Sequence, residues 1–436
     1  MSRPPGDDRY ARSNALLARA EKVIPLGSQT FSKSWTQYPK GHAPLFVTRG
    51  RGGRVWDVDG NEYVDLVGGL LPIVLGYRDP DVDAAVRAQL ENGISFSLAT
   101  ELEVELAELL VELIPCAERV RFGKNGSDAT SACVRIARAA TGRDRIAAGG
   151  YHGWQDWYIG ATARHKGVPG AVRALTHRFP FLDLEALEAL LRTHPNEFAG
   201  VIVETVGAAE PPEGHLDALR DLTHSHGALL IFDEIVTGFR VHLGGAQARY
   251  GVTPDLAAFG KSMGNGMPIS AVVGRADLMS EMEHIFFSST FGGETLSLAA
   301  SLATLRKMRA LRVVDALWRK GEALADGVRR LVETHGLAGT ISVAGIPAWT
   351  LLGFGDTPSG EPKEAVKTLL LRELLRGGVL TTGSHNVCYA HDEEDLALVL
   401  GAYDRALAAV SEAVRKGNVE AGLGCPVIRP VFAVRG

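Results

Sequence analysis

The stretch DLAAFGKSMGNGMPIS, residues 255–270, decides the fold of this 436-residue chain. A short apolar run within it ends in a glycine and Lys261, and a glycine-rich turn follows. A second apolar run, in LLIFDEIVTGFR at residues 229–240, ends in Asp233. Short apolar runs that end in polar residues are typical of buried parallel strands. We therefore expect Lys261 and Asp233 to meet at the carboxyl edge of one sheet, where open α/β sheets bind ligands.

An amine and a carboxylate at such an edge suit pyridoxal phosphate. A lysine forms a Schiff base with the aldehyde of this cofactor, and an aspartate keeps the pyridine nitrogen protonated, so that the ring can accept electrons. Once a substrate amine displaces it, the lysine becomes a free base close to the substrate Cα. A lysine after a strand is more commonly a solvated loop residue, so the assignment depends on further segments in the right order.

Two further segments offer groups that this cofactor would need. RFGKNGSDATSACVRIARAATGR, residues 121–143, turns at Asn125–Gly126 and continues as a helix for which Ser127 is a good N-cap. Free N–H groups at a helix start suit a phosphate, although a capped helix without a ligand is commoner. GGYHGWQDWYIG, residues 149–160, contains Tyr151, which is placed to stack on a flat ring. An ordinary aromatic cluster in a core or interface explains this segment equally well.

Together these segments resemble a class III (subgroup II) pyridoxal-phosphate-dependent aminotransferase of fold type I, in the branch of glutamate-1-semialdehyde 2,1-aminomutase. The resemblance covers nearly the whole chain, roughly residues 23–400. The segments that carry it are, in chain order, KVIPLGSQTFSKS, VWDVDGNEYVDLVGG, RFGKNGSDAT, GGYHGW, LLIFDEIVTGFR, PDLAAFGKSMGNGMPISAVVG and STFGGETLSLAA. Each segment is weakly diagnostic alone, but their order and spacing together are specific.

The resemblance implies a role for each matching residue. Lys261 would be the Schiff-base lysine, Asp233 would pair with the pyridinium nitrogen, and Tyr151 would complete the catalytic set. Tyr151 and Ile235 would pack on the two faces of the ring. Thr290 would reach the phosphate from the partner subunit, which implies a homodimer. The remaining cofactor contacts that the resemblance implies are Asn125, Gly126, Ser127, His152 and Glu204.

Three substrate contacts of the aminomutase differ in this chain. Lys33 stands where the aminomutase has an arginine that holds the substrate carboxylate, and lysine cannot form the same bidentate contact. Val387 stands near the position of a glutamate that holds the substrate amine, and Glu294 replaces a common asparagine. These differences argue against glutamate-1-semialdehyde as the substrate. Nearby polar side chains suit a polyhydroxylated ketone, or simply form a polar loop, and the candidate substrate contacts are Gln29, Lys33, Glu294 and His385.

We therefore expect an aminotransferase that moves an amino group from an amino acid donor, with glutamate the first choice, to a ketone or aldehyde. The acceptor would be a small molecule such as a keto sugar or cyclitol in a biosynthetic pathway. Intramolecular transfer by an aminomutase is the alternative, and it differs because a mutase uses one substrate and releases no 2-oxo acid. A third possibility is a non-enzymatic relative, which the presence of Lys261, Asp233, Tyr151 and Thr290 together disfavours.

The expected fold class is α/β, of the fold type I pyridoxal-phosphate transferases. Apolar runs and helical stretches alternate from about Leu71 to Leu305, which predicts a mostly parallel sheet flanked by helices; the resemblance implies seven strands. Residues 1–70 and 311–436 would form a small α+β domain from both termini, and residues 71–310 a large cofactor-binding domain. Asp59–Gly60 is a good hairpin turn within the first of these segments.

The composition excludes several other classes of protein. Hydrophobic residues make up 46% and charged residues 22% of the chain, which excludes a disordered chain. The net charge of −5 and the absence of a basic stripe give no reason to expect a nucleic-acid partner. The four cysteines are far apart and form no CxxC pair, so we expect neither a metal site nor disulfides. Without a signal core or a membrane-length apolar stretch, we expect no membrane partner and a cytoplasmic location.

Overall fold

The computed structural model describes residues 9–429, and this part of the chain divides into two compact units. The large unit comprises residues 71–73 and 80–314. The small unit comprises residues 9–70, 74–79 and 315–429. Residues 1–8 and 430–436, which belong to the terminal segments expected from the sequence, lie outside the described residues.

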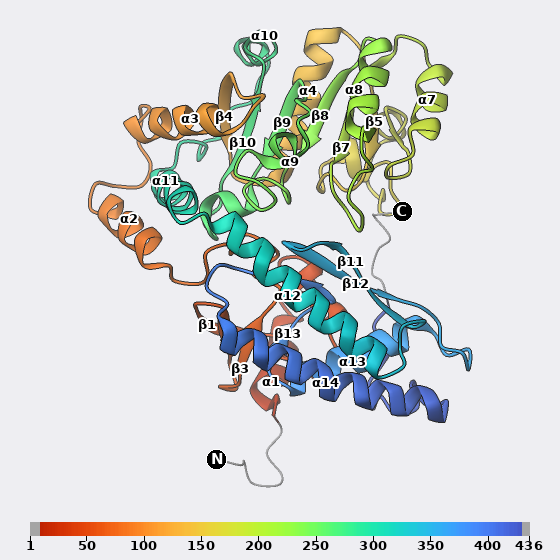
Figure 1. Ribbon diagram of the computed structural model, residues 1–436. Coiled ribbons are helices and arrows are strands. Elements are labelled where there is room, and N and C mark those ends of the chain that lie inside the picture. Colours follow the sequence, from red (N-terminus) through yellow and green to blue (C-terminus); the bar gives the residue numbers. More distant parts are fainter. Residues whose placement is uncertain (1–8, 430–436) are drawn as a thin grey trace. The chain divides into compact units, whose positions relative to one another are not determined.

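The large unit is built on a seven-stranded sheet (Figure 1). Only β10 runs antiparallel to its neighbours β4 and β9, and the other adjacent strands are parallel. This is the mostly parallel sheet expected from the sequence. In spatial order the strands are β4 (Arg119–Gly123), β10 (Ser270–Gly274), β9 (Leu256–Phe259), β8 (Leu229–Asp233), β7 (Phe198–Glu204), β5 (Arg145–Gly149) and β6 (Thr176–Arg178).

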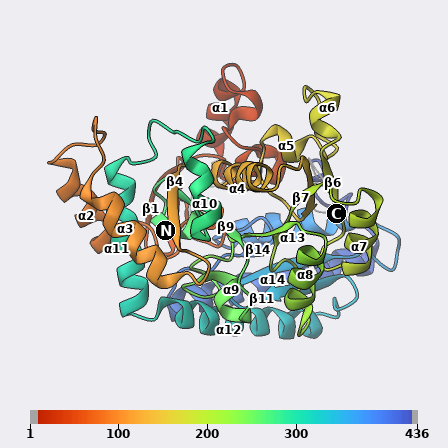
Figure 2. The same cartoon turned by 90° about the horizontal axis from the view of Figure 1, so that it is seen from above.

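Helices cover both faces of this sheet. Every residue of β7 and β9 is buried, as expected for strands that are packed on two sides. Helix α4 (Gly126–Thr141) packs on β10, β9 and β7, and α8 (His215–Ser225) packs on β8. Figure 2 shows α4 and α8 on opposite sides of the strands. The other α-helices of the large unit are α2 (Pro80–Leu90), α3 (Glu101–Leu113), α5 (Asp156–Ile159), α6 (Gly170–Arg173), α7 (Leu184–Thr193), α9 (Gly245–Tyr250), α10 (Ala276–Met279) and α11 (Thr295–Ala310).

The small unit contains two further sheets. In the first, β2 and β3 form the hairpin expected at Asp59–Gly60, with Gly60 at a φ of 84° that favours glycine. Its strands are β1 (Val47–Arg51), β2 (Arg54–Asp57), β3 (Glu62–Asp65) and β13 (Val379–Leu380). The second sheet contains β11 (Ile341–Ile346), β12 (Trp349–Phe354) and β14 (Ser384–His385). The α-helices that accompany them are α1 (Ala11–Ala20), α12 (Val313–Thr334), α13 (Lys363–Arg376) and α14 (Glu393–Lys416).

The last described segment, residues 417–429, has no helix or strand but packs on α13. The Arg372 guanidinium donates a hydrogen bond to the Gly422 carbonyl at 2.9 Å, and the Ile428 N–H donates to Thr368 Oγ1 at 2.9 Å. The segment therefore covers one helix of the small unit. Between residues 9 and 429, no helix combines the length and apolar character that crossing a bilayer requires.

Candidate active site

Strand register brings the residues expected at the site to one edge of the large sheet. Glu204, at the end of β7, pairs with Asp233 at the end of β8, and Asp233 pairs with Ala258 of β9. Lys261 follows β9 directly, so it emerges at the same edge. Strand β4 ends at Gly123 opposite the first residue of β10, and the segment before α4 therefore starts at this edge too.

Lys261 has an unusual backbone. Its φ of 40° lies in the left-handed region, which side chains other than glycine seldom adopt and which is associated with functional sites. Ile235 lies close by, because a Cβ added to Gly260 would be 3.2 Å from Ile235 Cδ1. A side chain at position 260 would thus press on Ile235.

Asp233 presents a buried carboxylate at this edge, with 5% of the residue exposed. Its Oδ1 accepts the Ile235 N–H at 3.1 Å, and its Oδ2 lies 2.8 Å from His152 Nδ1. A carboxylate that already accepts one N–H favours the histidine tautomer with its proton on Nδ1. His152 is 1% exposed and stacks on Trp157, with ring centroids 6.2 Å apart. Within residues 9–429, His152 Nε2 has no hydrogen-bond partner.

Glu204 holds the aromatic segment against the sheet edge. Its Oε2 accepts the Tyr151 N–H at 2.9 Å. A Cβ added at Gly150 would lie only 2.7 Å from the same oxygen, so the glycine lets the two segments approach closely. Tyr158 supports the same segment: its hydroxyl donates to the Gly150 carbonyl at 2.6 Å, and its ring meets the Tyr151 ring edge-on at 5.6 Å. Tyr151 is therefore fixed through both backbone and ring, and it remains partly exposed.

The turn before α4 has the features of an anion site, with one correction. Asn125, not Ser127, is the N-cap, and the helix begins at Gly126. The reason is that Asp128 Oδ2 accepts the Lys124 and Asn125 N–H groups at 3.1 and 2.8 Å, which places the cap two residues earlier than expected. The Gly126 and Ser127 N–H groups have no partner within the described residues and lie at the positive end of a 16-residue helix.

These residues fit pyridoxal phosphate. A Cβ at Gly126 would lie 3.0 Å from Ile235, so only a glycine leaves the space between the turn and the sheet edge open. The turn offers donors to a phosphate, Asp233 offers a carboxylate to a ring nitrogen, and Tyr151 and Ile235 offer apolar faces. All of these groups belong to the large unit.

Glu294 has a different environment from the one expected. Its carboxylate caps α11 by accepting the Leu296 N–H at 2.7 Å, and it also accepts the Ser297 hydroxyl at 2.6 Å. It further forms an ion pair with Lys124, at 2.9 Å between Nζ and Oε2. Because these partners occupy the carboxylate, we no longer assign Glu294 a substrate contact. Thr290, in the loop that precedes Glu294, is exposed.

The small unit contains the other candidate substrate contacts. His385 is 1% exposed, and its ring nitrogens lie 2.8 Å from Thr350 Oγ1 and 2.7 Å from the Tyr403 hydroxyl. Burial lowers its pKa to about 4. His385 is therefore a core residue, and its assignment as a substrate contact is withdrawn. Gln29 and Lys33 are exposed, and their role stays a prediction.

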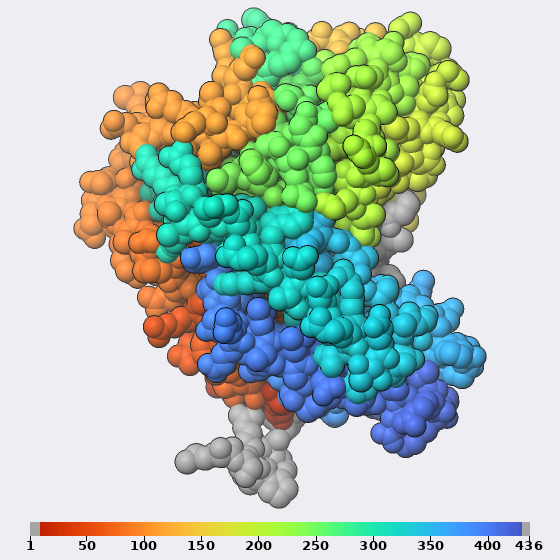
Figure 3. All heavy atoms as spheres, viewed as in Figure 1, coloured from red at the N-terminus to blue at the C-terminus, as the bar shows by residue number. Residues whose placement is uncertain are grey.

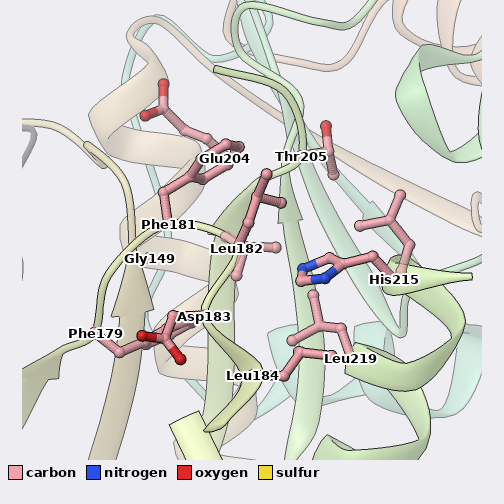
Figure 4. A pocket seen from close by; sticks show the side chains of 12 residues that line it. Gly149, Phe179, Phe181, Leu182, Asp183, Leu184, Glu204, Thr205, His215 and Leu219 are labelled. Carbon is pink, nitrogen blue, oxygen red and sulfur yellow. The ribbon is translucent and has the colours of Figure 1, made fainter. Parts of the chain in front are cut away.

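Two hollows in the large unit differ in what they can hold. Figure 4 shows a cavity of about 10 Å³ beside the end of β7, lined by Phe179, Thr205 and His215 among others. It has room for about one water molecule and is too small for a cofactor. An open groove of about 850 Å³ runs between α3, β4 and residues 288–293. Within the described part of the chain, no group of three metal-binding side chains is placed to hold an ion.

Two supporting residues, Lys124 and Tyr158, could not be predicted from local sequence patterns. Lys124 was not expected to matter, since its partner Glu294 lies 170 residues away in the chain. Tyr158 is one of several aromatic residues in GGYHGWQDWYIG, and no local signal distinguishes an aromatic residue that supports Tyr151 from one that packs elsewhere. Spacing in the sequence does not reveal such distant contacts.

Comparison with known proteins places this chain among related sequences. A family model described as "Aminotransferase class-III" matches residues 37–392. The chain is 37% identical to a 3-aminobutyryl-CoA aminotransferase of Cloacimonas acidaminovorans, over 93% of this chain and 98% of that protein. It is also 37% identical to a glutamate-1-semialdehyde 2,1-aminomutase of Roseiflexus castenholzii, over 93% and 99%. The FumI protein of Sphingopyxis sp., in its PLP internal aldimine form, superposes with a TM-score of 0.86 at 31% identity, over 93% and 97% of the two chains.

Proposed function

Because the chain belongs to the class III aminotransferases, we propose that it transfers an amino group from an amino acid, with glutamate the first choice, to a ketone or aldehyde on a second molecule. The observation that carries this proposal is the edge shared by β8 and β9. There Lys261, in a strained left-handed conformation, follows the strand next to the one that ends in buried Asp233.

Each residue of the site has a distinct task in this proposal. Pyridoxal phosphate, when bound, supplies an aldehyde and an electron-accepting ring. Lys261 supplies the attacking amine and then a base that moves a proton at the substrate Cα. Asp233 holds a proton on the ring nitrogen, while His152 and the Ile235 N–H orient its carboxylate. The turn at Gly126 anchors the phosphate.

The acceptor in this proposal is a ketone or aldehyde, and several classes of carbonyl compound are candidates. Because His385 is buried in the core, it is no longer one of the polar groups that favoured a keto sugar or cyclitol as the acceptor. The relative from Cloacimonas acts, by its name, on a 3-amino acyl thioester, which adds 3-oxoacyl thioesters to the acceptors worth testing. The relative from Roseiflexus keeps the aminomutase alternative open.

We further propose a homodimer in which Thr290 of the partner subunit reaches the phosphate. Its support is the resemblance, the exposure of Thr290, and the groove beside residues 288–293. A cytoplasmic location is also proposed, supported by four unpaired cysteines, which are typical of a reducing compartment.

The test begins with the aminated form of the holoenzyme, prepared with glutamate and freed of it. This form is incubated separately with a keto sugar, an inosose, a 3-oxoacyl thioester and glutamate-1-semialdehyde. We expect at least one of the first three to restore the starting cofactor spectrum and to appear as an aminated product by mass spectrometry. Turnover with glutamate should release 2-oxoglutarate in equal amount.

Lys261→Ala tests the residue assignment. We expect it to lower turnover by roughly 10³-fold or more, because both nucleophile and base are lost. Lys166→Ala, at an exposed lysine of the same unit, is the matched control and should keep wild-type turnover. If only glutamate-1-semialdehyde reacts and no 2-oxo acid forms, intermolecular transfer is wrong and the mutase alternative stands.

A further inference from the structure

An ion pair joins two segments of the large unit beside the proposed phosphate turn. Lys124 Nζ lies 2.9 Å from Glu294 Oε2, and only 14% and 12% of the two side chains are exposed. Lys124 directly precedes the turn, and Glu294 directly follows the loop at residues 288–293 that contains Thr290. The pair therefore connects the turn proposed to hold the phosphate of this subunit's site with the loop whose Thr290 is proposed to reach the phosphate of the other subunit's site.

On the side of the turn, Lys124 is tied to the start of α4. Its N–H and that of Asn125 both donate to Asp128 Oδ2, at 3.1 and 2.8 Å. The unpartnered N–H groups of Gly126 and Ser127 follow immediately. A shift of Lys124 would consequently move the donors that face the phosphate.

On the side of the loop, Glu294 is tied to the start of α11 through the Leu296 N–H and the Ser297 hydroxyl. The loop itself is tightly seated: a Cβ at Gly293 would lie 2.7 Å from a Glu103 oxygen, and one at Gly292 would lie 3.1 Å from the Phe122 carbonyl. Thr290 therefore sits in a loop whose far end is fixed by Glu294.

The electrostatics of the pair favour two charged partners. Burial acts to raise the pKa of Glu294, but hydrogen bonds from Ser297 and Lys124 outweigh it and leave the pKa below its usual value. Salt screens partly buried pairs less than exposed ones. Loss of one partner would leave an unpaired charge beside the turn, which is more disruptive than loss of both.

We propose that the Lys124–Glu294 pair is a positioning device that sets the phosphate turn and the Thr290 loop in one arrangement. Both residues act through others and are not catalytic. The inference rests on the proposed function, because it presupposes that pyridoxal phosphate binds at the turn. It is distinct from a simple electrostatic role, in which Lys124 would attract the phosphate as a free positive charge and Glu294 would only weaken that attraction.

The two roles predict opposite effects of removing Glu294. Apoprotein is titrated by absorbance with pyridoxal phosphate and, separately, with pyridoxal, which lacks the phosphate. For a positioning pair, Lys124→Met and Glu294→Gln each raise the Kd for pyridoxal phosphate roughly tenfold, and the double variant is no worse than either. The Kd for pyridoxal stays unchanged in all three, because the pair acts only on the phosphate contact.

Lys307→Met is the matched control. It removes a lysine that is as little exposed as Lys124, at 15%, and that pairs with the more exposed Asp81 near the other end of α11. It should leave both dissociation constants unchanged, and it should lower the melting temperature of the apoprotein by no more than Lys124→Met does, because its partner Asp81 stays solvated. Should a single variant fold poorly, the neutral pair Lys124→Gln with Glu294→Gln leaves no unpaired charge and keeps an acceptor for the Leu296 N–H. It is expected to fold and to bind pyridoxal phosphate with a Kd within about tenfold of the wild type.

Three results would overturn the inference. Tighter binding of pyridoxal phosphate by Glu294→Gln would assign Lys124 a simple charge role. Unchanged binding in both single variants, with normal binding by the wild type, would leave the pair purely structural. A wild-type protein that binds neither compound would remove the proposed function together with this inference, and this result is thus distinguishable from the other two.

Discussion

At the scale of single residues, Asp233 is the most constrained group of the site. Two donors approach it, the His152 ring and the Ile235 N–H, and a carboxylate can accept about four. His152 Nε2 has no hydrogen-bond partner within the described residues. With the ring proton on Nδ1, Nε2 is a neutral acceptor, and leaving it unpaired costs less free energy than leaving a charged N–H unpaired. The surroundings thus provide Asp233 with two hydrogen-bond donors and leave its carboxylate able to accept about two more, one of which we propose to be the ring nitrogen of the cofactor.

Asp233→Asn tests whether the charge of this residue is needed. The amide keeps the shape of the carboxylate but cannot hold a proton on the ring nitrogen by charge. We expect kcat to fall by roughly 10²–10⁴-fold, measured with cofactor content checked by absorbance. Asp156→Asn, at an exposed position, should leave kcat unchanged. A value of kcat within threefold of wild type would remove Asp233 from the reaction.

The burial of His385 should make the folded protein lose stability in acid, because it lowers the pKa of this residue. Its pKa is about 4 in the folded state and 6.5 unfolded, so between these values only the unfolded chain binds the proton. Stability is fully present above pH 6.5 and falls as the pH decreases, by about 2 kcal/mol at pH 5. Urea unfolding of wild type and His385→Gln at pH 7.5 and 5 measures this. The variant should lose about 2 kcal/mol less than wild type over this interval, and equal losses would contradict the assignment.

At the scale of elements, the segments that follow two strands, β5 and β8, pack around the start of α4. Gly153, after β5, is in contact with Ser127, since a Cβ there would lie 2.2 Å from its hydroxyl. Ile235, after β8, packs on Gly126. Glu234, also after β8, fixes α9 by accepting the Ala246 and Gln247 N–H groups at 2.8 and 3.0 Å. The strand ends therefore hold the helix starts, and the phosphate turn is placed by sheet register.

Gly153→Ala should disturb the phosphate turn. Both Gly153 and Gly167 have positive φ, 105° and 92°, but a Cβ at Gly167 would meet nothing within 4 Å. Backbone strain alone costs on the order of 1 kcal/mol, which we expect for Gly167→Ala. Gly153→Ala should add the clash with Ser127 and raise the cofactor Kd at least tenfold. Thermal melting and cofactor titration measure the two effects, and equal behaviour of the variants would refute this packing argument.

At the scale of the whole molecule, the large unit exposes large apolar side chains near α3 and near Thr290. Leu98 is 85% exposed, Val104 56%, Phe286 81% and Phe291 57%. Leu98 and Val104 belong to α3 and the residues before it, a region that Figure 3 draws in orange, and Phe286 and Phe291 lie in the segment around Thr290. Clusters of exposed apolar side chains are typical of interaction sites. A second copy of the chain is the occupant that the position of Thr290 favours.

Val104→Glu should weaken the proposed homodimer, because it places a charge among the exposed apolar side chains that would form the contact. We expect monomers at micromolar concentration by sedimentation velocity, with weaker cofactor binding because Thr290 of the partner subunit is lost. Val23→Glu is the matched control: Val23 is 80% exposed, lies in the small unit, and should leave the dimer intact. A dimeric Val104→Glu, or a monomeric wild type, would refute this interface.

Local patterns in the sequence were sufficient for much of the site. Apolar runs ending in Asp233 and before Lys261 predicted adjacent strand ends, because burial on both faces requires continuous apolar residues. The Asp59–Gly60 hairpin followed from the conformational freedom of glycine. The resemblance then supplied the roles of residues such as Tyr151 and Thr290, which no periodicity predicts.

Tertiary structure alone decided which polar groups already have partners. Glu294 and His385 read in the sequence as free polar side chains near a substrate, yet Lys124 and α11 occupy the first, and Thr350 and Tyr403 enclose the second. The Asn125 cap likewise depends on Asp128 reaching back along the chain. The physical reason is that strand and helix propensities act over a few residues, whereas hydrogen bonds and ion pairs form between side chains that only the folded backbone brings together.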